Sequence, residues 1–146
     1  MKGQTHKPDD SIQLSAIAKN YSPALNKILK VKSVKIKDLP DFMIKNNYST
    51  IQWENGSRHK DNFIVSNGTT GDYDLGIKTM LEVHEHLKAK GINHVIIPSK
   101  SHTEEHPRFH VLILFDVPVY SKTTYKQIAL QMIDELFPDS DKSVAD

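Results

Sequence analysis

The strongest strand signal in the chain is the hydrophobic run from Phe109 to Phe115. Its aliphatic and aromatic residues are typical of a strand that is buried in a sheet. Arg108 and His110 stand at the start of this run, two positions apart. Because side chains on a strand alternate between its two faces, we expect Arg108 and His110 to share one face, opposite Phe109 and Val111.

Two helices and a further strand surround this run. Hydrophobic residues recur at three- and four-residue steps over residues 77–87, which predicts an amphipathic helix. Residues 95–97 predict a buried strand, and residues 98–107 predict a polar, hairpin-like connection. The last helix is expected to begin at a cap provided by Ser121 or Thr123. Its apolar stripe consists of Tyr125, Ile128, Ala129, Met132, Ile133 and Leu136.

From Asp72 onward the expected order of elements is strand, helix, strand, strand, helix. This order predicts an α+β fold with a split βαβ arrangement, an open sheet with helices packed on one face. No long linker divides the chain, so we expect a single domain over residues 1–146. A helical and β extension is expected at its N-terminus, over residues 1–60. Its elements are helices at 12–21, which Ser11 caps, and at 24–29, and strands at 31–36 and 48–53.

Composition narrows the class of protein. Hydrophobic residues make up 38% of the 146 residues and charged residues 25%, as in soluble globular proteins. The formal charge of +1 means that nucleic-acid binding would require a local basic patch. The absence of cysteine excludes disulfides and thiolate metal sites. No apolar run reaches the ~20 residues of a membrane span, and no signal peptide core is present, so we expect a cytoplasmic protein.

Asp72 and Asp74 are candidate metal ligands. In an extended segment, two carboxylates one residue apart point to the same side, although the preceding residues 66–71 are expected to form a loop or a loosened strand. Mg²⁺ and Mn²⁺ prefer carboxylate oxygens, and two such ions can activate an attacking hydroxyl and stabilise a leaving pyrophosphate. A third carboxylate is expected where the chain re-enters the sheet after the last helix. Asp141 is the candidate, and Asp139 and Asp146 compete with it.

Candidate nucleotide contacts lie around the start of the hydrophobic run. His110 is placed to contact a phosphate or a sugar, and Arg108 supplies a charge-assisted fork for phosphate oxygens. Further polar side chains at the end of the preceding strand are placed to hold a triphosphate across the hairpin. They are Ser99, Lys100, Ser101 and His102.

Other polar and aromatic residues are expected to be structural. His84 and His86 stand two apart on a helix and therefore face apart, which excludes them as a metal site. His106 is expected in a solvated loop, and the basic run from 27 to 37 on a solvated face rather than on a phosphate backbone. Trp53, the one tryptophan, is expected to fill the core or a sheet edge rather than to stack on a base.

Three motifs together resemble those of the archaeo-eukaryotic primase superfamily. They are Asp72-Tyr73-Asp74, then Ser99 followed by Arg108-Phe109-His110, then Asp141-Lys142-Ser143. The pattern looks most like the primase-polymerases of phages, plasmids and other mobile elements, and covers roughly residues 60–146. The resemblance implies an RRM-like catalytic core over 61–146. It also implies that Asp72, Asp74 and Asp141 bind two divalent ions, Mg²⁺ or Mn²⁺, and that His110 contacts the nucleotide. Ser99, Lys100, Ser101 and Arg108 would lie against the triphosphate.

The function implied by the resemblance is that of a DNA primase-polymerase, a nucleotidyltransferase that joins nucleotides on a single-stranded DNA template. Nucleoside triphosphates, template DNA and a helicase domain or protein are the implied partners, and the chain would be a catalytic core excised from a longer protein. Two alternatives stay open. One is a replication-initiator endonuclease of the HUH type with Tyr125 as nucleophile, although Arg108-Phe109-His110 supplies one histidine where that motif has two. The other is a non-catalytic module that binds single-stranded nucleic acid.

Overall fold

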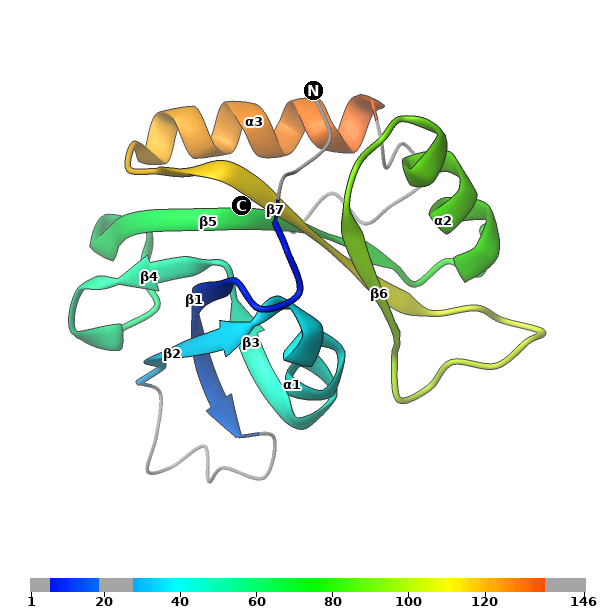
Figure 1. Cartoon of the computed structure of the whole chain (residues 1–146), viewed down its shortest axis with the longest axis horizontal. Coiled ribbons are helices and arrows are strands. Elements are labelled where there is room, and N and C mark those ends of the chain that lie inside the picture. Colours follow the sequence, from blue (N-terminus) through cyan, green and yellow to red (C-terminus); the bar gives the residue numbers. More distant parts are fainter. Residues whose placement is uncertain (1–5, 19–27, 136–146) are drawn as a thin grey trace.

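Strand β7 (Phe109–Val119) is the centre of the fold, and the other elements can be placed relative to it (Figure 1). The computed structural model describes residues 6–18 and 28–135, which form an α+β fold with two antiparallel sheets. The four-stranded sheet has the order β4 (Ile51–Trp53), β5 (Phe63–Tyr73), β7 and β6 (His94–Pro98). The three-stranded sheet has the order β2 (Lys30–Lys35), β1 (Ser11–Ala18) and β3 (Asn46–Ser49).

The three α-helices of the described residues are α1 (Leu39–Lys45), α2 (Met80–Ala89) and α3 (Lys122–Glu135). Thr79 begins α2 with a capping box, because its side chain accepts from the Glu82 amide and the Glu82 side chain accepts in return from the Thr79 amide. Ser121 caps α3, since its Oγ lies 3.2 Å from the Thr124 amide nitrogen. Single 3₁₀ turns cover Ile36–Asp38, Glu54–Gly56 and Lys60–Asn62.

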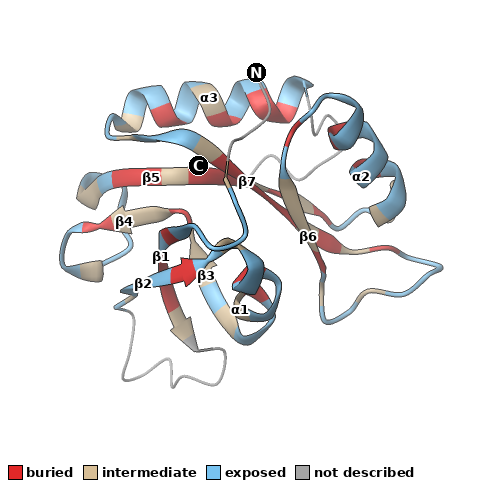
Figure 2. Ribbon diagram, in the orientation of Figure 1, coloured by how far each residue is buried: buried red, intermediate tan, exposed pale blue. Residues whose placement is uncertain are grey.

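Strand β7 is hydrophobic on both faces, which explains why its sequence is a continuous apolar run. Phe109 and Val111 face α2 and α3, where they pack with Val83 and Leu87. Leu112 and Leu114 belong to a second cluster on the opposite face, together with residues of β1, β2 and α1. Figure 2 shows the buried residues concentrated along β5 and β7. The predicted strand is confirmed, and His110 shares the face of Leu112 and Leu114.

Residues 11–18 form strand β1, so the helix predicted from Ser11 is wrong. Ile12, Leu14 and Ala16 are all buried, and their two-residue spacing is that of a strand with one face on the core. The strand predicted at 31–36 is confirmed as β2, whose lysines are exposed as expected. The run 48–53 is divided between the two sheets at Thr50. The second predicted helix has its first four residues, 24–27, outside the described part of the chain.

Strand β5 covers eleven residues, so residues 66–71 form a strand, the second of the two predicted alternatives, and not a loop. A Cβ atom on Gly68 would lie 2.3 Å from the carbonyl oxygen of Ile113, so only glycine allows β5 to approach β7 this closely. The register shifts between Ser66 and Gly68, and pairing is regular beyond that point. This regular pairing places Asp72 directly opposite His110.

The two helices predicted in the second half of the chain are confirmed as α2 and α3, with changes at their ends. The amphipathic helix begins at Met80, so Ile77 precedes it and is 61% exposed, whereas Val83 and Leu87 are buried. In α3, the stripe residues Tyr125, Ala129, Met132 and Ile133 are buried, and Leu136 lies outside the described residues. Within residues 6–18 and 28–135, no helix has the length and hydrophobicity needed to cross a membrane.

Candidate functional site

The side chains of Asp72 and His110 meet across the two central strands. Asp72 Oδ1 lies 2.5 Å from His110 Nδ1, and the two side chains are 29% and 39% exposed. On the other side of the ring, Ser99 Oγ lies 3.1 Å from His110 Nε2. Because the carboxylate can only accept, Nδ1 carries the proton, and the Nε2 of a neutral ring then accepts from the Ser99 hydroxyl. The imidazole is therefore held between a carboxylate and a hydroxyl.

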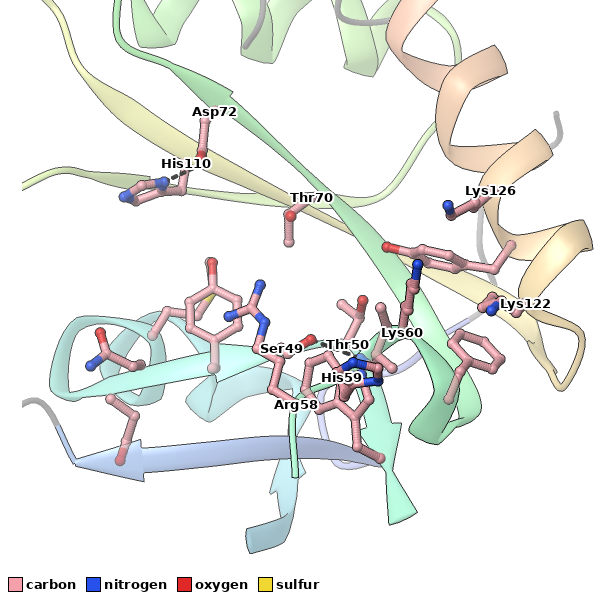
Figure 3. Close-up of a pocket in the computed structure, with 18 residues that line it drawn as sticks. Ser49, Thr50, Arg58, His59, Lys60, Thr70, Asp72, His110, Lys122 and Lys126 are labelled. Atoms are coloured by element: carbon pink, nitrogen blue, oxygen red, sulfur yellow. Dashed lines mark hydrogen bonds and ion pairs between the residues drawn. The ribbon is translucent and has the colours of Figure 1, made fainter. Parts of the chain in front are cut away.

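Asp72 and His110 line one end of a cleft of about 440 Å³. The cleft lies against the face of β5 and β7 that carries Thr70, Asp72 and His110, and residues of β3, β4 and the beginning of α3 complete its lining. In Figure 3, Thr70 lies between the Asp72–His110 pair and two lysines farther along the cleft, Lys122 and Lys126. The lysine and arginine side chains that line the cleft are Arg58, Lys60, Lys122 and Lys126.

The basic residues come from the connection before β5 and from the first turns of α3. The rings of Phe63 and Tyr125, with centroids 5.7 Å apart, join the beginning of β5 to the beginning of α3. The Arg58 guanidinium carbon lies 5.3 Å from the centroid of the Trp53 ring, a cation–π contact. Sequence reasoning missed this group because residues 58–60 and 122–126 are distant in sequence and meet only in the folded chain.

Tyr48 also lines the cleft, and its ionisation is linked to Asp72. Burial, and in second place the negative charge of Asp72, raise the pKa of Tyr48 well above that of a free phenol. The hydroxyl of Tyr48 therefore stays protonated at neutral pH and keeps a proton that it can donate to a bound ligand.

The structure separates the two aspartates that were predicted to share a strand face. Strand β5 ends at Tyr73, so Asp74 follows the strand and is exposed, and only Asp72 of the pair lines the cleft. Asp141 lies outside the described residues, as do its competitors Asp139 and Asp146. Among the residues described, no group of three or more histidine, aspartate or glutamate side chains is arranged to hold a metal ion.

The predicted triphosphate contacts lie in the hairpin between β6 and β7. Ser99 touches His110, whereas Lys100 and Ser101 are exposed. Arg108 is half-buried, and its backbone amide donates to His102 Nδ1 over 3.0 Å. Apart from His110, the residues of this hairpin do not line the cleft described above.

His106 has a structural role that was not predicted for it. Its ring is exposed, but Nε2 lies 2.9 Å from the backbone oxygen of Asp74 and donates to it. Gly76 lies directly against this ring, with a φ of +73°. A hydrogen bond and a close contact therefore tie the β6–β7 hairpin to the turn that carries Asp74.

His84 pairs with His94 rather than with His86. His84 Nδ1 lies 2.9 Å from His94 Nε2, and His94 Nδ1 donates to the Ile92 backbone oxygen over 2.8 Å. Desolvation by burial lowers the pKa of His94, and the neighbouring His84 lowers it further, against the opposing effect of the Ile92 carbonyl.

The cleft combines a carboxylate–imidazole pair, a group of cations and aromatic rings. This set of side chains suits a ligand that carries phosphates, since lysine and arginine bind phosphate oxygens and a carboxylate binds hard metal ions that accompany them. Comparison of the chain with protein-family models, curated proteins and solved structures gave no match. A functional assignment therefore depends on the chemistry of these residues.

Proposed function

We propose that the chain is a template-directed nucleotidyltransferase, a DNA primase-polymerase, and that it reacts at the Asp72–His110 end of the cleft. The observation that carries this proposal is the pairing of Asp72 with His110 in a cleft whose other end is basic. A nucleoside triphosphate and a DNA strand both present phosphates, which require cations for binding, and their reaction requires groups that stabilise charge at one phosphate.

The proposed reaction needs divalent ions, and Asp72 is the carboxylate of the cleft that could bind one. Asp72 uses Oδ1 for His110, and a carboxylate has a second oxygen with which it can bind a cation. Asp74 offers the same hard donor two residues later, although it does not line the cleft, and Asp141 remains the proposed third ligand. Bound Mg²⁺ or Mn²⁺ would polarise the phosphoryl oxygens and neutralise charge that develops on them.

His110 is the proposed contact to the nucleotide. Rotation of its ring would break two hydrogen bonds, one to Asp72 and one to Ser99. A ring fixed in this way is preorganised, so that it does not have to be oriented at the moment of reaction. The remaining proposed triphosphate contacts are Ser99, Lys100, Ser101 and Arg108.

The strand order supports an RRM-like core. Strands β5 and β6 are both antiparallel to β7, so they run parallel to each other with β7 between them. Helix α2 connects β5 to β6, and a strand–helix–strand unit opened by a third strand is the split βαβ arrangement. This order agrees with the catalytic core that the sequence motifs imply for residues 61–146. A cytoplasmic location and a helicase partner are part of the same proposal.

The test is incorporation of a labelled nucleotide on a single-stranded DNA template in the presence of Mg²⁺ or Mn²⁺. The proposal expects products that grow with time, follow the template sequence and disappear when the metal is chelated. A chain that binds DNA and nucleotide but forms no phosphodiester bond with either metal would contradict it.

One observation favours a second candidate, the HUH-type endonuclease. Tyr125 lines the same cleft as His110, where it could attack a DNA phosphate. Against this candidate, Tyr125 is only 6% exposed and packs on Phe63. A covalent adduct between the protein and DNA that is lost in Tyr125→Phe would favour it.

A non-catalytic module of the RRM kind uses exposed aromatic residues on its central strands, whereas Phe109 is fully buried.

A further inference from the structure

The basic end of the cleft has no role in the chemistry proposed at Asp72. We name the four basic side chains that line the cleft, Arg58, Lys60, Lys122 and Lys126, the basic wall. We propose that the basic wall is a separate phosphate-binding site that holds the phosphodiester backbone of a DNA strand. Only the choice of a DNA strand as ligand depends on the proposed function, because the phosphate site follows from the charges themselves.

Positive charge is concentrated at the basic wall, whereas the chain as a whole is almost neutral. The chain carries a formal net charge of +1, yet four basic side chains line this one cleft. Asp61 is their nearby counter-charge, with Oδ1 4.0 Å from Lys122 Nζ, and its side chain is 69% exposed. An ion pair this long and this exposed is weak, so a multiply charged anion can displace it.

The positions of the cations are held by packing. The Trp53 ring supports the Arg58 guanidinium, and contact between Phe63 and Tyr125 fixes the beginning of α3, from which Lys122 and Lys126 project. Charged side chains on a well-fixed backbone lose less conformational freedom when a ligand binds than charged side chains on loose segments do. The fold therefore holds the cations of the basic wall in place, although they come from two segments that are distant in sequence.

The location of the wall favours a strand over a single nucleotide. Figure 3 shows Thr70 between the Asp72–His110 pair and Lys122 and Lys126, so the reacting phosphate and the basic wall are different places. A ligand that reaches both places needs phosphates spaced along its length, as in a nucleic-acid backbone, whereas the phosphates of a triphosphate are directly joined to one another. Other polar side chains that line the cleft, including Ser49 and Asn47, offer hydrogen bonds to phosphates and sugars.

The experiment measures binding of a fluorescent single-stranded DNA oligonucleotide by anisotropy over a range of salt concentrations. The test variant is Lys60→Gln with Lys126→Gln, both exposed lysines of the basic wall. The matched control is Lys88→Gln with Lys90→Gln, which removes the same charge from α2 and the residue that follows it. A second arm measures binding of a nucleoside triphosphate with Mg²⁺ by calorimetry for the same proteins.

We expect the test variant to bind DNA roughly tenfold more weakly at low salt and to lose about 1.4 units from the slope of log affinity against log salt, about 0.7 for each phosphate contact to a single strand. The control should lose neither, and triphosphate binding should match the wild type in both variants. DNA binding unchanged in the test variant would overturn the proposal, and so would loss of triphosphate binding with DNA binding intact. Because this assay requires no reaction, its outcome is independent of whether the chain joins nucleotides. Circular dichroism of both variants checks that they are folded, and the single variant Lys126→Gln should show half the change in slope.

Discussion

Asp72 and His110 lie directly opposite each other on neighbouring antiparallel strands, with Oδ1 and Nδ1 2.5 Å apart. The contact depends on the register of β5 against β7, because a slip of one residue would turn one of the two side chains to the other face of the sheet. Gly68, four residues before Asp72, lets the two backbones come close enough to set that register. The Asp72–His110 contact therefore depends on the packing of β5 against β7 as much as on the two residues themselves.

Substitution of Gly68 by alanine should damage both the sheet and the site. The added Cβ would lie 2.3 Å from the backbone oxygen of Ile113, which cannot move without shifting β7. We expect a loss of about 3 kcal/mol or more in the free energy of unfolding, at the upper end of the overpacking range. Urea denaturation measures this loss, and an unchanged midpoint would show that the two strands are not this close.

Gly76 and Gly91 provide a matched test of the contact with His106. Both have a positive φ, +73° and +70°, so alanine strains the backbone equally at the two sites. A Cβ at Gly76 would also lie 2.8 Å from His106 Nδ1, whereas Gly91 has no atom within 4 Å of that position. Gly76→Ala should therefore reduce the free energy of unfolding more than Gly91→Ala.

The excess cost of Gly76→Ala should disappear when His106 is also replaced by alanine. A double-mutant cycle with the four proteins measures this coupling. Equal costs at Gly76 and Gly91 in the wild-type background would mean that the ring of His106 does not rest on the Asp74 turn.

Ser99 is expected to act as a positioning residue for His110. Ser99→Ala removes the hydroxyl that meets Nε2, and a hydrogen bond of about 1 kcal/mol corresponds to a roughly fivefold loss in rate. The loss should appear in kcat rather than in KM, and Ser99→Thr, which keeps a hydroxyl, should restore most of it. If alanine and threonine behave alike, the contact between Ser99 and His110 has no part in the reaction.

His94 should make the folded state sensitive to acid. Its pKa is lowered in the folded protein, so between the ordinary histidine pKa of about 6.5 and this lower value the unfolded chain binds the proton and the folded chain does not. Stability contributed by His94 is thus present above pH ~6.5 and falls as the pH decreases through that value. The difference in free energy of unfolding between the wild type and His94→Gln, measured in urea at pH 7.5 and 5.5, should shift against the wild type at the lower pH. A difference that does not change with pH would contradict the assigned burial.

The elements that could be predicted from the sequence are those whose hydrophobic pattern is compatible with only one type of secondary structure. The run from Phe109 to Phe115 is too hydrophobic and too rich in aliphatic residues to be anything but a buried strand, and α3 has its stripe at clear helical spacing. In residues 11–18, Ile12, Leu14 and Ala16 fit a strand, but Ile17 added to them also allows a helix. Pairing with β2 and β3 decides between the two readings, and that information is not local.

The candidate site likewise contains residues that could be predicted from the sequence and residues that could not. His110 could be located because it begins an evident strand, whereas residues 66–71 have little strand propensity and become a strand through close pairing with β7. The extent of β5 also decides that Asp72 lines the cleft and Asp74 does not. The basic wall could not be predicted, because its two segments are separated by some sixty residues of chain and meet through contact of Phe63 with Tyr125.

The most direct test of the proposed function compares Asp72→Asn with Asp116→Asn in template-dependent incorporation of a labelled nucleotide. Asparagine keeps the shape of Asp72 but removes the charge that a divalent ion needs, while Asp116 is an exposed residue of β7 outside the cleft. We expect Asp72→Asn to lower incorporation by roughly a hundredfold or more with both Mg²⁺ and Mn²⁺, as for the loss of one key group that stabilises transition-state charge. Asp116→Asn should match the wild type. Incorporation by Asp72→Asn at the wild-type rate would contradict the assignment of Asp72 as a catalytic residue and, with it, the proposed site.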